Sequence, residues 1–191
     1  NTGIEVAWNV QVLNQPNLAW SLGGNYQRVD NEVTDMGGAA DFAVDGAGGY
    51  KYVTLGKPVG SHFLSTPIDT NEDGLPDSSE DQYSGGHPTP TQSGSFNTSL
   101  RIGQSLTVSS MADWAAGHEI FDWGSVWATY NGIFRQEEIE GVPYPIRYNE
   151  DGTEDRPYPW TQARSAFLYD GDWLKWRELS VRDSMPDEWA T

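Results

Sequence analysis

The sequence predicts an all-β fold, an antiparallel meander that forms part of a transmembrane β-barrel with long extracellular loops. Apolar and polar residues alternate along segments of about ten residues, which is the reach of a tilted transmembrane strand. The polar positions carry mostly Ser, Asn, Gln, Thr and Gly, as a wet lumen would. Short turns alternate with long irregular connections, which is typical of such barrels. Residues 1–191 are expected to form one partial barrel domain.

The first hairpin is predicted over residues 3–30. Its first strand alternates from Gly3 to Leu13, a four-residue turn follows at 14–17, and the second strand alternates in the same way. The apolar positions of the two strands are Ile4, Val6, Trp8, Val10, Val12, Leu18, Trp20, Leu22 and Tyr26.

A second hairpin of the same design is predicted over residues 94–114, with its turn at 103–105. Phe96, Leu100 and Ile102 alternate with polar residues before this turn, and Leu106 and Val108 do so after it. One more strand is predicted near residues 172–182.

Long loops are predicted over about 31–93 and 115–171, with a short strand at 50–55 in the first of them. Loops of this length are unusual in a compact soluble domain unless they have a function. The alternative is a secreted, soluble β-sandwich module that binds carbohydrate with the support of calcium.

Composition excludes several classes of protein. The net charge of −17 and the pI near 4.2 argue against nucleic acid as a partner, because nucleic-acid affinity depends on clustered Lys and Arg. The absence of cysteine excludes a disulfide scaffold and a thiolate metal site. The three histidines, His62, His87 and His118, lie in loop-like contexts, and there is no nucleophile elbow or zinc-protease motif. The protein is therefore not expected to be an enzyme, and a glycan hydrolase would need two carboxylates facing one cleft.

Residues Asp69 to Glu80 match the twelve-residue calcium-loop pattern. Pro67 and Pro88 make helices improbable on both sides, so this is not an EF-hand. No cofactor is required, and the two interpretations are a weak calcium site or a metal-free loop rich in Asx-turns. The candidate calcium ligands are Asp69, Asn71, Asp73, Leu75 through its carbonyl, Asp77 and Glu80.

Exposed aromatic rings of the second long loop are the candidate ligand contacts, because such rings stack on sugars and on apolar ligand surfaces. They are Trp123, Trp127, Tyr130, Phe134, Tyr144, Tyr148, Tyr158 and Trp160. For each of them the alternative is loop packing or a place in an interfacial girdle.

Several loose motifs follow one another in order along nearly the whole chain. They are Gly3-Ile4-Glu5, residues 20–33, Gly56-Lys57-Pro58-Val59-Gly60 with Phe63, the D-x-N-x-D-G-x-x-D run from Asp69, residues 87–100, residues 116–121 and residues 169–186. Together they resemble the TonB-dependent outer-membrane receptors, and within them the SusC/RagA-like importers.

This resemblance implies energised import of a glycan, peptide or siderophore across the outer membrane of a Gram-negative cell. The implied partners are outer-membrane lipid, a SusD-like surface lipoprotein and the TonB system, which acts through a plug region. The plug and the closing strands of an approximately twenty-two-stranded barrel are missing, so the chain is expected to be a fragment. Arg182-Asp183-Ser184 also departs from the aromatic residues that are usual there.

Overall fold

The computed structural model describes residues 1–45, 50–68, 70, 78–130, 147–148, 154–155 and 164–184. Two compact units share the chain. The strand unit consists of Asn1–Asp30, Pro90–Gly117 and Asp172–Thr191, and the loop unit consists of Asn31–Thr89 and His118–Gly171.

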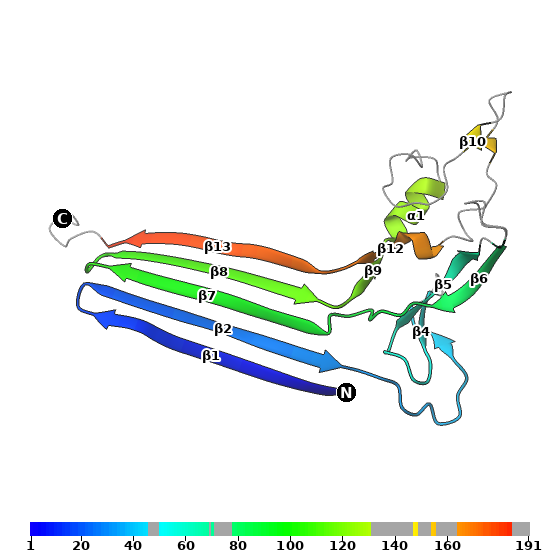
Figure 1. Cartoon of the computed structure of the whole chain (residues 1–191), viewed down its shortest axis with the longest axis horizontal. Coiled ribbons are helices and arrows are strands. Elements are labelled where there is room, and N and C mark those ends of the chain that lie inside the picture. Colours follow the sequence, from blue (N-terminus) through cyan, green and yellow to red (C-terminus); the bar gives the residue numbers. More distant parts are fainter. Residues whose placement is uncertain are drawn as a thin grey trace. The chain divides into compact units, whose positions relative to one another are not determined.

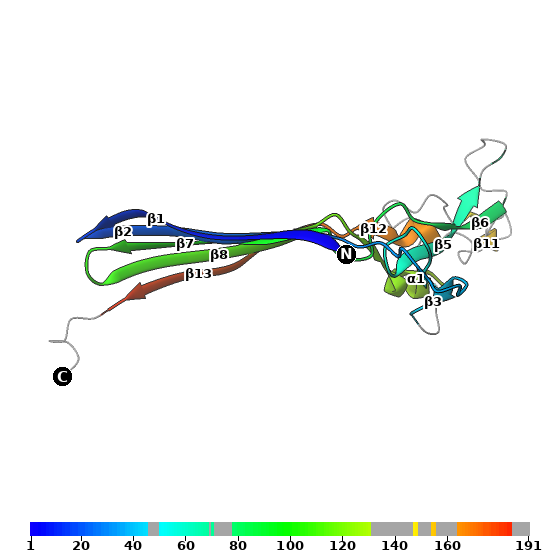
Figure 2. The same ribbon diagram turned by 90° about the horizontal axis from the view of Figure 1, so that it is seen from below.

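The strand unit contains one five-stranded antiparallel sheet (Figure 1). Its order is β1-β2-β7-β8-β13, so every strand lies beside its neighbour along the chain within this unit. Seen from its edge, the sheet is a single twisted layer (Figure 2). The strands are β1 (Thr2–Gln15), β2 (Leu18–Asp30), β7 (Gln92–Ile102), β8 (Leu106–Ala116) and β13 (Trp173–Asp183). The predicted all-β, antiparallel fold class is confirmed.

The first turn is tighter than the sequence predicted. Asn14 pairs with Ala19 and Gln15 with Leu18, so only Pro16 and Asn17 remain outside the strands. The second turn covers residues 103–105, as predicted, and Gly103 has the positive φ of +65° that a glycine adopts at little cost.

A β-bulge corrects the predicted alternation of the first strand. Val10 pairs with Leu22 and Leu13 pairs with Trp20, so Val12 is the extra residue and Leu13 continues the apolar face. The side-chain amide of Gln11 donates to the carbonyl oxygens of Leu13 (2.6 Å) and Trp20 (3.0 Å). These two bonds hold the bulge closed.

Both long connections leave the sheet at the same end. Gln92 pairs with Arg28 and with Ala116, so the chain leaves β2 and β8 beside the point where it enters β7. The two tight turns join the strands at the opposite end. This is the asymmetry of short turns and long loops that the sequence predicted.

The loop unit is built around a four-stranded sheet of order β3-β4-β5-β6. Its strands are β3 (Phe42–Ala43), β4 (Lys51–Val53), β5 (Ser61–Ile68) and β6 (Ser78–Tyr83). Two further pairs are β9 (Glu119–Phe121) with β12 (Leu168–Asp170), and β10 (Arg147–Tyr148) with β11 (Glu154–Asp155). The helices among the described residues are α1 (Trp123–Tyr130) and a 3₁₀ turn at Arg164–Phe167. Among the described residues, no helix has the length and apolar character needed to span a membrane.

The small core of the loop unit gathers residues from three elements. Leu64 on β5, Val126 on α1 and Phe167 in the 3₁₀ turn are at most 2% exposed. His62, also on β5, is 1% exposed. Segments far apart in the sequence therefore fix one another in this unit.

Candidate functional site

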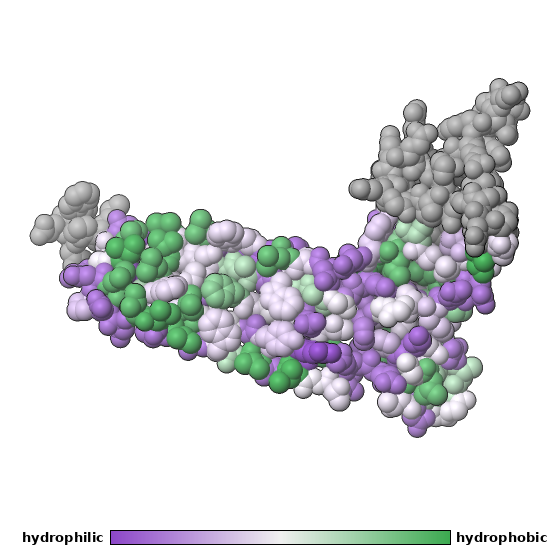
Figure 3. All heavy atoms as spheres, in the orientation of Figure 1, coloured by the Kyte–Doolittle hydropathy of each residue, from purple (hydrophilic) through white to green (hydrophobic). Residues whose placement is uncertain are grey.

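One face of the five-stranded sheet is apolar from edge to edge. Directly paired residues of neighbouring antiparallel strands share a face, so the registers define rows across the sheet. One row runs Trp8, Gly24, Phe96, Ala112 and Trp176. The next row runs Val6, Tyr26, Gly94, Trp114 and Leu174. Hydrophobic residues gather over the sheet in Figure 3.

Aromatic rings and glycines alternate in these two rows for a steric reason. A Cβ on Gly24 would lie 2.8 Å from a ring carbon of Trp8, and a Cβ on Gly94 would lie 2.8 Å from the indole nitrogen of Trp114. The rings of Trp8 and Phe96 have centroids 6.1 Å apart, as do those of Tyr26 and Trp114. The result is an aromatic band, defined as Trp8, Tyr26, Phe96, Trp114 and Trp176.

Two polar groups of aromatic residues on the apolar face have hydrogen-bond partners. The indole N–H of Trp20 donates to Thr98 (2.9 Å), and the hydroxyl of Tyr26 donates to the side-chain oxygen of Gln92 (3.1 Å). A face that meets hydrocarbon must satisfy such groups internally. The apolar side chains themselves are uncovered: Leu174, Leu179 and Val181 are 75%, 65% and 67% exposed. The sandwich alternative expects a second sheet over this face, and the described residues of the strand unit form only this one sheet.

The opposite face of the sheet is polar. One row consists of Gln11, Ser21, Ser99, Ser109 and Ser180, and the next contains Asn9, Gly23, Asn97, Met111 and Glu178. The hydroxyls of Ser109 and Ser180 are 2.6 Å apart. Charged groups also lie on this face, among them Asp113, whose carboxylate accepts a hydrogen bond from Arg177 at 2.6 Å. This face offers many neutral hydrogen-bonding groups to an aqueous space.

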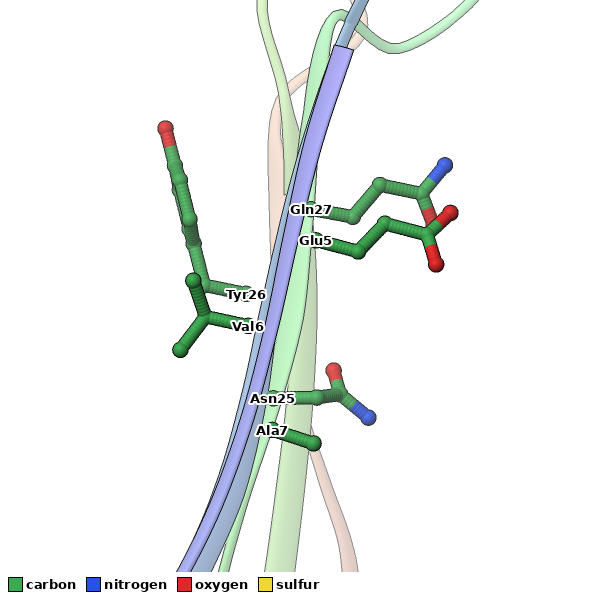
Figure 4. Close-up of a pocket in the computed structure, with 6 residues that line it drawn as sticks. All are labelled: Glu5, Val6, Ala7, Asn25, Tyr26 and Gln27. Carbon is green, nitrogen blue, oxygen red and sulfur yellow. The ribbon is translucent and has the colours of Figure 1, made fainter.

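The two faces separate cleanly at β1 and β2 (Figure 4). Val6 and Tyr26 point to one side of the strands, and Glu5, Asn25 and Gln27 point to the other. These residues line a shallow, open depression at the β1 edge. It follows the outer edge of β1, which pairs with no other strand among the described residues.

An aromatic cluster lies in the loop unit. Tyr50 contacts Phe121 and Trp123, with ring centroids 4.7 and 5.5 Å apart, and Trp123 contacts Trp127 at 5.8 Å in an edge-to-face arrangement. Trp127 is 46% exposed. Helix α1 holds both tryptophans because they are four residues apart on one side of the helix.

Asp122 caps this helix at its N-terminus. Its carboxylate accepts the backbone N–H of Ser125 at 2.9 Å and the Ser125 hydroxyl at 2.6 Å. These bonds, with that hydroxyl as the main contributor, lower the pKa of Asp122. The cap thereby fixes where Trp123 begins the helix.

His62 is not in a loop, contrary to the sequence interpretation. It lies on β5, and its Nδ1 is 4.0 Å from Glu119 Oε2. Neither atom has a hydrogen-bond partner. Burial lowers the pKa of His62 and Lys51 lowers it further, while Glu119 and Asp45 oppose the shift. The sequence did not show this position, because a single buried histidine carries no periodic signal of its own.

The structure brings together two of the predicted ligand contacts, Trp123 and Trp127. Tyr130 ends α1 and Tyr148 ends β10, but their side chains lie outside the described part of the chain. Phe134, Tyr144, Tyr158 and Trp160 also lie outside the described residues.

Of the predicted calcium loop, the structure describes mainly the two flanking strands. Strands β5 and β6 enter and leave it, so it joins a β-hairpin, and no helix flanks it. Glu80, the predicted last ligand, sits on β6 opposite Thr66 and is exposed. Asp69, Asn71, Asp73, Leu75 and Asp77 lie outside the described residues. The described part of the chain contains no cluster of three or more His, Asp or Glu side chains suited to a metal ion.

Solved structures with the same fold are known. The chain superposes on the RagAB peptide transporter with a TM-score of 0.66 at 12% identity, over 97% of this chain and 23% of that one. It also matches the RagAB peptide importer in the "open-open" state (TM-score 0.64, 13% identity, 99% and 22% covered) and in the "closed-closed" state (0.62, 14%, 99% and 23%). The chain thus spans less than a quarter of these proteins. No protein-family model and no curated protein matches the sequence.

Proposed function

We propose that this chain is a wall segment, with its external loops, of an outer-membrane importer of the SusC/RagA-like, TonB-dependent class. The observation that carries the proposal is the single-layer sheet with one uncovered apolar face and one polar face. Its apolar face meets lipid, and its polar face lines the lumen. The fold shared with the RagAB peptide transporter supports it.

The proposed cargo is a peptide. The motif resemblance leaves glycans, peptides and siderophores open, and the fold likeness to a peptide importer favours peptides. Import is driven through TonB by a plug domain of the full-length protein, and a SusD-like surface lipoprotein acts at the loop side. Candidate contacts with the cargo are Trp123 and Trp127.

The membrane orientation can be tested with single cysteines, because the chain has none of its own. In the full-length protein in lipid vesicles, an environment-sensitive fluorophore at Leu22→Cys or Val108→Cys should be quenched by brominated lipid. At the adjacent positions, Ser21→Cys and Ser109→Cys, it should be quenched by aqueous iodide. Iodide quenching at all four positions would contradict a membrane wall and favour the soluble module.

Transport can be tested in cells that express the full-length protein. Uptake of a fluorescent mixture of short peptides should exceed that of a strain lacking the gene, and a protonophore should abolish the excess because TonB-type import draws on the proton gradient. Uptake that is insensitive to the protonophore would refute energised import. Equal uptake in both strains would refute peptides as the cargo.

A further inference from the structure

Among the described residues, Arg164 has no carboxylate partner, although the chain is strongly acidic. Asp and Glu number 28 against 11 Lys and Arg. In the described part of the chain, Arg28 and Arg177 each pair with an aspartate, whereas the guanidinium of Arg164 has no ion pair. Its Nε is buried and has no hydrogen-bond partner. A desolvated, unpaired guanidinium nitrogen is costly unless a ligand satisfies it.

The surroundings of Arg164 are aromatic. Its Cζ lies 5.7 Å from the centroid of Trp123, as in a cation–π contact. Trp123 in turn contacts Trp127, which is the exposed end of the aromatic cluster. The backbone N–H of Arg164 donates to Ser65 Oγ at 3.4 Å, which ties the start of the 3₁₀ turn to β5. The backbone of Arg164 is therefore tied to β5, and its guanidinium lies over the Trp123 ring.

We propose that Arg164, Trp123 and Trp127 form a binding site for the C-terminal carboxylate of a peptide and its last, apolar side chain. Arginine binds a carboxylate through two parallel hydrogen bonds, and indole rings take up an adjoining apolar group. The proposal deepens the proposed function and rests on it for the choice of a peptide. The recognition chemistry, a carboxylate next to an apolar group, is independent of transport.

The test uses the full-length protein in detergent micelles and two fluorescein-labelled peptides of glycine and serine that end in phenylalanine. One peptide has a free C-terminal carboxylate and the other a C-terminal amide. Fluorescence anisotropy should show the amide binding at least about tenfold more weakly, since a hydrogen bond to a charged group contributes roughly that much. Arg164→Gln should abolish the difference between the two peptides, and Arg164→Lys should retain part of it. Trp127→Ala should weaken both by a similar factor.

Arg28→Gln is the matched control, because Arg28 is paired with Asp30. It should leave the preference for the free carboxylate unchanged. If Arg164→Gln binds the amide peptide as tightly as the wild type does, the variant is folded. If Arg164→Gln binds neither peptide, Arg164→Lys takes its place in the comparison. Equal affinities for the two peptides in the wild type would overturn the proposal. If neither peptide binds, the same assay is run with a fluorescent glucuronate oligosaccharide. Binding that Arg164→Gln removes would show that the site takes a carboxylate from a sugar and not from a peptide. No binding of the oligosaccharide would overturn the proposal. The two proposals can be refuted separately, because carboxylate binding at Arg164 can be observed even if the uptake experiment shows no import.

Discussion

At the scale of single residues, His62 links acidity to the stability of the loop unit. Its folded pKa lies below the usual value of 6.5, chiefly because of burial. Between these two values the unfolded chain binds more protons than the folded one, so stability is fully present above about pH 6.5 and falls as the pH is lowered through the window. The groups that face it are Lys51, Glu119 and Asp45.

We therefore expect the loop unit to melt at a lower temperature at pH 5.5 than at pH 7.5, as followed by near-ultraviolet circular dichroism of its aromatic cluster. His62→Gln should lower the melting temperature at pH 7.5, because it disturbs a buried site, and should flatten the dependence on pH over this range. The same slope in the variant as in the wild type would assign the effect to other groups.

A second residue-scale expectation concerns Gly24 in the aromatic band. Its added Cβ would meet the backbone carbonyl of Ser95 at 2.6 Å and the Trp8 ring at 2.8 Å. Gly24→Ala should destabilise the sheet by about 1–3 kcal/mol, which is typical of overpacking. Gly85→Ala is the control, because no atom lies within 4 Å of its added Cβ. Urea unfolding in detergent gives the midpoint of each variant. Equal midpoints for Gly24→Ala and Gly85→Ala would show that the Trp8 ring and the strand that carries Ser95 move aside at little cost.

At the scale of elements, the N-terminal cap of α1 positions the predicted ligand contacts. Asp122→Ala should cost about 1 kcal/mol of stability, because the Ser125 N–H loses its acceptor. Since the pKa of Asp122 is lowered, its contribution is present above the usual value of 3.8 and is lost as the pH falls below that value. Asp122→Asn should keep most of the cap at neutral pH. The melting temperatures of the wild type, Asp122→Ala and Asp122→Asn test this expectation. Equal melting temperatures would show that the cap does not stabilise α1.

The elements also show what the sequence could and could not predict. Alternation marks β1, β2, β7 and β8 because a strand's side chains have a period of two. The bulge at Val12 could not be predicted, since it depends on a bond from Gln11 to Trp20 on the partner strand. Arg164 was missed because its contact with Trp123 joins distant segments and leaves no local pattern. Trp123 and Trp127 stay predicted ligand contacts, and the structure adds that they lie together on α1.

At the scale of the whole molecule, the edges and the faces of the five-stranded sheet have different requirements. The edge strands need hydrogen-bond partners for their backbone, and the apolar face needs an apolar environment. The outer edges of β1 and β13 present unpaired backbone groups in the described sheet, and only further strands can satisfy these within a hydrocarbon layer. Under the proposed function, the apolar face meets lipid. A membrane barrel completed by other strands meets both demands at once.

This leads to a paired test on neighbouring residues of β2. Leu22 is on the apolar face and Ser21 is on the polar face. In the full-length protein, Leu22→Arg should oppose membrane assembly by about 2–4 kcal/mol, because it places a charge against lipid near mid-depth, whereas Ser21→Arg should be tolerated in the wet lumen. Heat-modifiable migration on a gel reports the folded fraction of each variant in the membrane. Equal folding of the two would mean that the faces are assigned to the wrong environments, since in a barrel wall only the direction of the side chain distinguishes the two positions.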